Sequence, residues 1–429
     1  MSDLAEPIDA VIDGKRYAVY QEVVKGVANI AFKRIKDEPL SRSAKGAIPV
    51  LWEDGLSGGM GYGRAVKGGP TDAYAHTVGF DSHLPGLSRL HGRRVSVSPT
   101  NPPVDANTDF FEALQTVPTA EFFCGSFTKD TNSGTVTQSS ISHGLSVEPQ
   151  AMILWWPDQT SSGTVAAGDS TGWGLLRRGV GFPSGTGRAA AWASEDAVGT
   201  SNAARKFAGI GTQASIAFIS PSGTDGPHGV LTNFDTSTFD IDWTTNNTDA
   251  AIIHFLAIGG PEIQTSIAAW ILQTSAGSKA VSGVGFQPDV CIHISSSTTG
   301  ATAVDDAKMS MGVMDASGNQ WSTSIYSQDA QGTSNTLSGS SNALALNGID
   351  SAGTAVAQTF VSMDSDGFTT SGSANAADLV ATLCIKGVRA LAGNFTKKTS
   401  TGNQAAQTIG FTTEAFLVAS TQATAHGAT

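Results

Sequence analysis

The stretch Gly283–Ile294, GVGFQPDVCIHI, joins a glycine-rich turn, an aromatic residue, a proline and an apolar run. Proline fixes its own φ and pushes the residue before it into an extended conformation, so a β-strand is expected to start after Pro288. Related phrases begin at Gly144 (GLSVEPQAMILW) and at Thr408 (TIGFTTEAFLVA). The same strand start therefore occurs three times, which indicates a repeat protein.

A longer polar motif, S-x-D-A-x-G-T-S-N, supports the repeat. It occurs at Ser194–Asn202 and again at Ser327–Asn335, with seven of nine positions identical. Further along each copy, Asp235 and Asp364 are each followed by a phenylalanine and then by a closing apolar run. Two homologous units of roughly 130 residues are the simplest explanation.

Within a unit, short apolar segments alternate with polar turns. Strands are expected at QAMILWW, DVCIHI, ASIAFIS, TFDIDW and AIIHFLAI, and turns at TDGPHG (224–229) and TTNNTD (244–249). No long segment has the period of an amphipathic helix. The sequence therefore predicts an all-β chain, with a small β-rich N-terminal module followed by tandem antiparallel β-sandwiches of jelly-roll or lectin-like type.

The N-terminal part lacks the repeat. Ile8–Tyr20 has Asp13-Gly14 between two alternating segments, which is a hairpin signal, and Gln21–Ile35 is interpreted as strand. Ser98–Asp109 is rich in Pro and Asn and is expected to be a linker. The predicted domains are an anchoring module (1–97), a linker (98–118), two repeats (119–262 and 263–388) and a C-terminal segment (389–429).

The C-terminal segment is a partial third repeat or a strand-exchange segment. Ala392–Ser420 repeats the opening of the first unit and then the strand start. Because two isolated strands are marginal in water, they are expected to need a partner. Three alternatives are open: they complete the preceding sandwich, they add to a neighbouring subunit, or the chain is a truncated or processed form.

Composition argues against several classes of function. The net charge of −12 leaves no basic surface for a nucleic-acid backbone, so nucleic acid is not an expected partner. The N-terminus, MSDLAEPID, does not resemble a signal peptide, and the longest apolar run, Ala250–Gly260, is too short for membrane insertion. A soluble protein made in a cytoplasm is expected. The three cysteines are interpreted as buried thiols: Cys124, Cys291 and Cys384.

Two of the repeated phrases carry a family resemblance. Val281–Ile294, Ser362–Thr369 and the closing apolar strand resemble the β-sandwich repeats of tailed-bacteriophage virion proteins, which occur in tails, fibres and other surface structures. Leu51–Arg64 also resembles a Trp- and Gly-rich segment near the start of some phage tail proteins. The sandwich resemblance covers about residues 120–429, although the first unit has Ser146-Val147 in place of Gly-Phe. It implies a structural or adhesive role and no catalytic residues.

Candidate chemistry is sparse. Gly55–Gly59, GLSGG, has the form of a nucleophile elbow at Ser57, but the following GGMGYG is a poor helix start, so a glycine loop is favoured. Asp364–Gly367, DSDG, resembles part of a calcium loop without its closing Glu, so a tight turn is favoured. The repeated polar motif offers ligand-binding or contact loops through four side chains: Asp196, Asn202, Asp329 and Asn335.

Aromatic and histidine side chains offer a weaker signal. The tryptophans could include a sugar-stacking platform, but core packing is favoured because most lie in expected strands: Trp155, Trp156, Trp173, Trp192, Trp243, Trp270 and Trp321. His254 and His293 lie in apolar strands and are interpreted as core residues. No catalytic, cofactor-binding or metal-ligating residue is predicted, and the chain is expected not to be an enzyme.

The functional hypothesis is a structural component of a bacteriophage virion, either of the tail or of a surface appendage. The N-terminal module would assemble it and the tandem sandwiches would be displayed, with copies of itself, other virion proteins and host-surface glycan as partners. Synthesis in the host cytoplasm is expected to precede incorporation into the virion. Alternatives are a carbohydrate-binding adhesin or receptor-binding protein, and a capsid decoration protein. A glycan hydrolase would need a pair of carboxylates, and no repeated pair is present.

Overall fold

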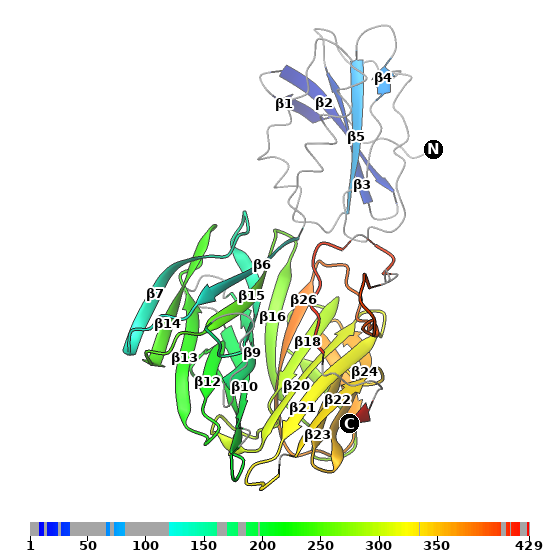
Figure 1. The fold of residues 1–429 in the computed structure, drawn as a ribbon. Coiled ribbons are helices and arrows are strands. Elements are labelled where there is room, and N and C mark those ends of the chain that lie inside the picture. The colour runs from blue at the N-terminus through cyan, green and yellow to red at the C-terminus, as the bar shows by residue number, and fades with distance from the viewer. Residues whose placement is uncertain are drawn as a thin grey trace. The chain divides into compact units, whose positions relative to one another are not determined.

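The structure is a computed structural model of the 429-residue chain. It describes residues 120–160, 170–178, 186–195, 198–333, 335–404, 409–411 and 413–420, and the backbone of strands at 8–12, 15–24, 27–34, 66–68, 73–81 and 427–428. The chain forms two compact units, Met1–Pro118 and Thr119–Thr429, each described here by itself (Figure 1). The predicted linker and the GLSGG loop with Ser57 lie outside the described residues.

The N-terminal unit contains one antiparallel sheet in the order β1-β2-β3-β5-β4. Its strands are β1 (Ile8–Ile12), β2 (Lys15–Val24), β3 (Val27–Arg34), β4 (Val66–Gly68) and β5 (Ala73–Asp81). Ile12 pairs with Lys15 across the two-residue connection at Asp13-Gly14, so the predicted hairpin is confirmed. The strand interpretation of Gln21–Ile35 is also confirmed, because β2 pairs with β3 along its length.

The second unit begins with a sandwich of a large and a small sheet. The large sheet has the order β19-β11-β10-β9-β8-β15-β6 and the small sheet the order β12-β13-β14-β7. The strands of this first sandwich are β6 (Glu121–Thr128), β7 (Gly134–Ser142), β8 (Pro149–Trp156), β9 (Ser170–Arg177), β10 (Thr186–Ser194), β11 (Ala203–Ala208), β12 (Ile216–Ile219), β13 (Asp225–Thr232), β14 (Thr238–Asn246) and β15 (Ile252–Gly259). The remaining strand, β19 (Val304–Asp305), comes from the second repeat.

The second sandwich repeats this topology. Its large sheet has the order β16-β26-β18-β20-β21-β22-β27, and its small sheet the order β17-β25-β24-β23. The strands are β16 (Gln264–Ile271), β17 (Gly277–Ser282), β18 (Val290–Ser295), β20 (Ala307–Asp315), β21 (Gln320–Ser327), β22 (Thr336–Ser341), β23 (Leu346–Asp350), β24 (Gly353–Asp364), β25 (Gly367–Gly372), β26 (Leu379–Lys386) and β27 (Gly427–Ala428). The described residues contain no helix, so the all-β class with tandem sandwiches is confirmed.

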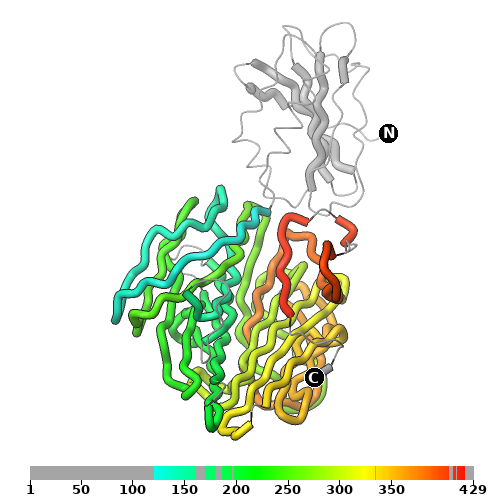
Figure 2. The backbone as a smooth tube through the Cα atoms, in the orientation of Figure 1, coloured from blue at the N-terminus to red at the C-terminus, as the bar shows by residue number. Residues whose placement is uncertain are grey.

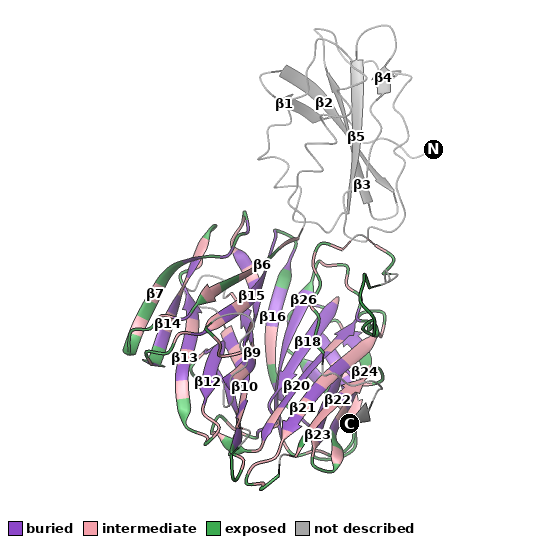
Figure 3. Cartoon of the chain, in the orientation of Figure 1, coloured by how far each residue is buried: buried purple, intermediate pink, exposed green. Residues whose placement is uncertain are grey.

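The two sandwiches pack together through their large sheets. Trp243 and Phe239 are fully buried in the core of the first sandwich, and Phe368 in that of the second. A third core lies between the two large sheets, and its buried residues include Phe207 of β11 and Leu383 of β26. The result is a stack of small, large, large and small sheets, with the buried strands in its middle (Figures 2 and 3).

This arrangement explains two kinds of strand sequence. Every residue of β18, VCIHIS, is buried, because one face of its sheet packs inside the sandwich and the other packs in the third core. The first residues of β14, TFDIDW, alternate between half-buried and buried, because only one face of a small sheet is covered. Continuous apolar strands therefore belong to the large sheets.

One predicted turn is wrong. TDGPHG lies almost entirely within β13, and the chain reverses earlier, where Gly223 has a φ of 78°. Proline cannot donate to a ladder and is tolerated in a strand at an irregularity. The β12–β13 register shifts between Ala217 and Ile219, next to Pro227, so this strand accommodates the proline at a bulge.

Two further expectations differ from the structure. Cys124 is exposed, whereas Cys291 and Cys384 are buried, with their sulfur atoms 3.7 Å apart. Between Lys386 and Ser420 the described residues form no strand. In each of the two repeats the last strand, β15 or β26, lies between the first and third strands, and the described part of residues 389–429 contains no counterpart of it. Among the described residues of this segment, β27 alone is a strand, and it pairs with β22 of the same chain.

Candidate functional site at the junction of the two sandwiches

The two copies of the repeated polar motif form loops of the same construction. In the first loop the Glu195 amide donates to the Asn202 carbonyl at 2.8 Å, and in the second the Gln328 amide donates to the Asn335 carbonyl at 3.0 Å. The asparagine side chain then donates back, from Asn202 Nδ2 to Glu195 Oε2 at 2.7 Å and from Asn335 Nδ2 to Gln328 Oε1 at 2.6 Å. Each loop therefore closes on itself through one backbone and one side-chain bond.

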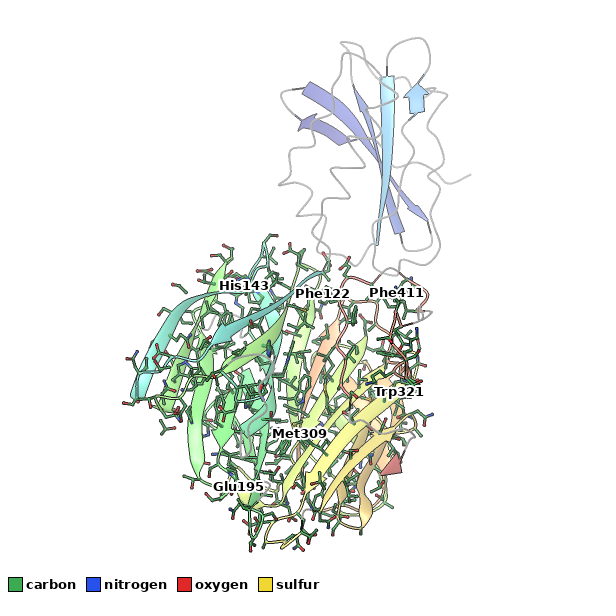
Figure 4. The ribbon with its side chains drawn as sticks, in the orientation of Figure 1. Phe122, His143, Glu195, Met309, Trp321 and Phe411 are labelled. Carbon is green, nitrogen blue, oxygen red and sulfur yellow. The ribbon has the colours of Figure 1, made fainter. Side chains whose placement is uncertain are left out.

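The two loops contact each other. The Ser201 amide donates to the Gln331 carbonyl at 2.9 Å, and the Ala330 amide donates to the Ser201 carbonyl at 2.8 Å. Ser201 Oγ donates to the Gln328 carbonyl at 2.9 Å and accepts from the Gln331 amide at 3.0 Å. Four hydrogen bonds thus join one copy of the motif to the other, at the edge of the stack where Figure 4 labels Glu195.

Asp329 extends this contact to the neighbouring strands. Its Oδ1 accepts from the Ala203 amide at 2.7 Å, at the start of β11, and its own amide donates to Asp306 Oδ1 at 2.9 Å. Of the four predicted ligand or contact residues, Asn202, Asp329 and Asn335 thus engage protein atoms at the junction. Asp196 lies outside the described residues. Asn202 and Asn335 bond within their own loops, and Asp329 bonds to Ala203 and Asp306, so the ligand or contact role of these loops stays a prediction.

Arg205 is a junction residue that sequence reasoning missed. It lies on β11, and its guanidinium donates to the carbonyls of Ser297, Asp305 and Asp306, which hold β19 against β11. Burial lowers the pKa of Arg205, while the charge of Asp306 opposes that shift. The partners are backbone carbonyls distant in sequence, so no residue pattern could have identified them.

A prediction follows for Ser201, whose hydroxyl both donates and accepts across the junction. Ser201→Ala removes both bonds and leaves the Gln331 amide unpaired in a half-buried site, so a loss of about 1–3 kcal/mol in the free energy of unfolding is expected. Thr200→Ala is the matched control, because Thr200 is the exposed neighbour and is expected to change stability by less than about 0.5 kcal/mol. Equal effects of the two substitutions in urea unfolding would show that the hydroxyl does not stabilise the junction.

The acidic turns use their carboxylates locally. Asp366 accepts from the amides of Gly285 and Gly283 at 2.6 and 3.0 Å, which lowers its pKa. Asp364 accepts from Ser362 Oγ and Thr369 Oγ1, both at 2.6 Å. The tight-turn interpretation of DSDG is confirmed, and this turn holds the glycines that precede β18.

The tryptophans divide between core and half-buried positions. Trp156, Trp243 and Trp270 are buried, and His293 is buried beside Trp270. A row of half-buried rings lies on the outer face of the first large sheet, where both tryptophans of the row also pack against the third core. Trp155 lies 5.8 Å from Trp173 and 5.7 Å from His254, measured between ring centroids.

A cavity of about 250 Å³ lies between the start of β6 and the C-terminal segment. Phe122, Arg389, Phe411 and Glu414 contribute to its lining, and Figure 4 labels the two phenylalanines near one end of the stack. The Arg389 guanidinium lies 4.9 Å from the centre of the Phe411 ring. This contact fastens the third strand-start phrase to the end of the second sandwich.

Among the described residues, no group of His, Cys, Asp and Glu side chains has the arrangement of a metal site. No helix among them is long and apolar enough to cross a membrane. The two copies of the repeated polar motif meet in a single junction. Comparison with protein-family models, with curated proteins and with solved structures finds no match.

Proposed function

We propose that the chain is a structural, non-enzymatic component of a bacteriophage virion, in the tail or a surface appendage. The N-terminal unit assembles the protein into the particle, and the paired sandwiches are displayed as one block. Its partners are copies of itself and other virion proteins. Capsid decoration is the same role at another location, and the experiment below distinguishes the two.

One observation carries this proposal. The most strongly repeated polar residues of the chain join the two sandwiches, through Ser201, Asp329 and the loops around them. The outer faces of the large sheets are likewise used in the third core. A chain that uses its repeated polar motif and its largest apolar faces for internal packing is suited to a stiff building block.

The experiment is location in the particle. Mass spectrometry of purified virions is expected to find the chain in many copies per particle, and antibody labelling in electron microscopy is expected to mark the tail or its appendages. Labelling of the head would instead support a capsid decoration protein. Absence from particles that carry their other structural proteins would overturn it.

The second candidate function is a carbohydrate-binding adhesin, favoured by the row of Trp155, Trp173 and His254. The counterpart positions in the second sandwich carry Ile294, Met311 and Ala381, all buried, so the fold itself does not require aromatic rings there. Partly exposed aromatic rings suit stacking against sugars. Saturable binding on a glycan array, lost when the three residues are changed to those of the second sandwich, would support this role.

A further inference from the structure

The two large sheets are closed at one end and open at the other. At the closed end, β19 pairs with β11 and β27 pairs with β22, so a short strand from the following part of the chain covers each edge. At the open end lie β6 and β16, which occupy the same place in the two sandwiches. No strand of the described part of the chain pairs with their outer edges.

The other free edges in the second unit carry features that discourage pairing. β7, β12 and β23 each show a register break against their neighbour, and β7 also contains Ser140 with a φ of 63°. β17 carries Lys279, begins at Gly277 and is followed by Gly283, and these two glycines have φ values of 144° and 86°. Bulges, short length and edge lysines are the usual means by which proteins keep sheet edges from adding strands.

β6 and β16 lack these features. Each has eight residues in unbroken register with its neighbour, and neither contains lysine, arginine or proline. The one charged residue, Glu121, accepts hydrogen bonds from the Ser146 amide and hydroxyl. Side chains near the ends of both strands are exposed, including Ile271, which is 48% exposed. Long, regular edges with a single, locally bonded charge are templates for another strand.

We propose that these edges join copies of the chain, with β6 of one copy pairing with β16 of the next. A second copy fits because each chain offers two edges of equal length, and the edges carry no charges that would repel each other. A head-to-tail contact uses both edges and can continue from copy to copy, as a structural component requires. This inference rests on the proposed structural function and names the partner as the same chain.

The test uses the full chain and paired lysine substitutions at exposed positions. The β6 variant is Ser126→Lys with Thr128→Lys, and the β16 variant is Ala269→Lys with Ile271→Lys. The control, Thr135→Lys with Ser139→Lys, places the same charges on exposed positions of β7. The unmodified chain is expected to form oligomers that grow with concentration in analytical ultracentrifugation. Each edge variant is expected to weaken self-association at least about tenfold, and the control is expected to leave it unchanged.

Mixing identifies the contact. The β6 variant keeps its β16 edge and the β16 variant keeps its β6 edge, so a mixture is expected to form one-to-one dimers that grow no further in native mass spectrometry. Unequal circular-dichroism spectra or unfolding midpoints would mark a folding defect, and the single substitutions Ser126→Lys and Ala269→Lys would then replace the pairs.

Two results would overturn the inference: a chain that stays monomeric at about 100 µM, and self-association that the β6 and β16 variants leave intact. Particle location is measured separately, so a monomeric chain found in virions would refute this contact and leave the proposed function standing.

Discussion

Replacing His293 with leucine is expected to remove about 5 kcal/mol of acid sensitivity from the second unit. His293 is fully buried in the second sandwich, and burial lowers its pKa to about 3. Its Nδ1 lies 2.7 Å from Thr382 Oγ1, which also accepts from Trp270 Nε1 at 2.8 Å. The ring therefore has a hydrogen-bond partner when neutral, and protonation would place a charge among aromatic side chains.

The direction of this pH dependence follows from proton binding at His293 in the folded and unfolded chain. The unfolded chain binds a proton at His293 below a pKa of about 6.5, whereas the folded chain binds one only near pH 3. As the pH falls between these values, the unfolded state takes up the extra proton, and the free energy of unfolding decreases by up to about 1.4 kcal/mol per pH unit. Stability from this group is fully present above pH 6.5 and is lost toward pH 3.

The measurement compares the unmodified chain with His293→Leu in urea unfolding from pH 7 to pH 3. Leucine is the residue of the first sandwich at this place, since Leu154 and His293 occupy matching positions in β8 and β18. Other titrating groups are shared, so they cancel in the difference. A difference that does not change with pH would show that the imidazole is protonated or exposed in the folded chain.

Phe207→Asp is expected to separate the two sandwiches. Phe207 is fully buried in the third core, on the outer face of the first large sheet. A carboxylate there would be buried among apolar side chains, and the guanidinium of Arg205, on the same strand, already donates to three backbone carbonyls, so a loss of more than about 4 kcal/mol is expected. Because Phe207 lies outside both sandwich cores, each sandwich is expected to keep its own packing while the contact between them opens.

Hydrogen exchange and urea unfolding check this result. Faster exchange is expected in β8–β11 and in β18–β20, and a single unfolding transition is expected to divide into two. Phe207→Leu keeps the site apolar and is expected to cost about 1–2 kcal/mol without dividing the transition. Val361→Asp, at a position 47% exposed, is the control for the added charge. One unchanged transition in the aspartate variant would mean that the third core does not couple the sandwiches.

Much of the fold could be predicted because short local sequence signals determine its strands and occur in both repeats. β8 begins at Pro149 and β18 begins two residues after Pro288, as the apolar runs that follow these prolines indicated. The Asp13-Gly14 hairpin is also present. The Pro227 segment was misread because a bulge tolerates proline, and a bulge depends on the neighbouring strand rather than on the local sequence.

The junction could not be predicted in the same way. The motif around Ser201 and Asp329 stands out in the sequence, but its partner is its own second copy, and self-pairing leaves no separate signal. The continuous apolar character of β18 indicated burial without stating that both faces are covered. Which faces of the large sheets meet depends on how the two sandwiches pack together, and local sequence patterns do not encode that packing.

The pairing of β19 with β11 has a mechanical consequence. In a string of separate domains, a pulling force unfolds one domain at a time and the chain lengthens in steps. Here the second repeat contributes a strand to the sheet of the first, and the two large sheets share a core. A load applied at the ends of residues 120–386 must therefore shear both sandwiches together, which makes the pair a stiff strut rather than an extensible tether.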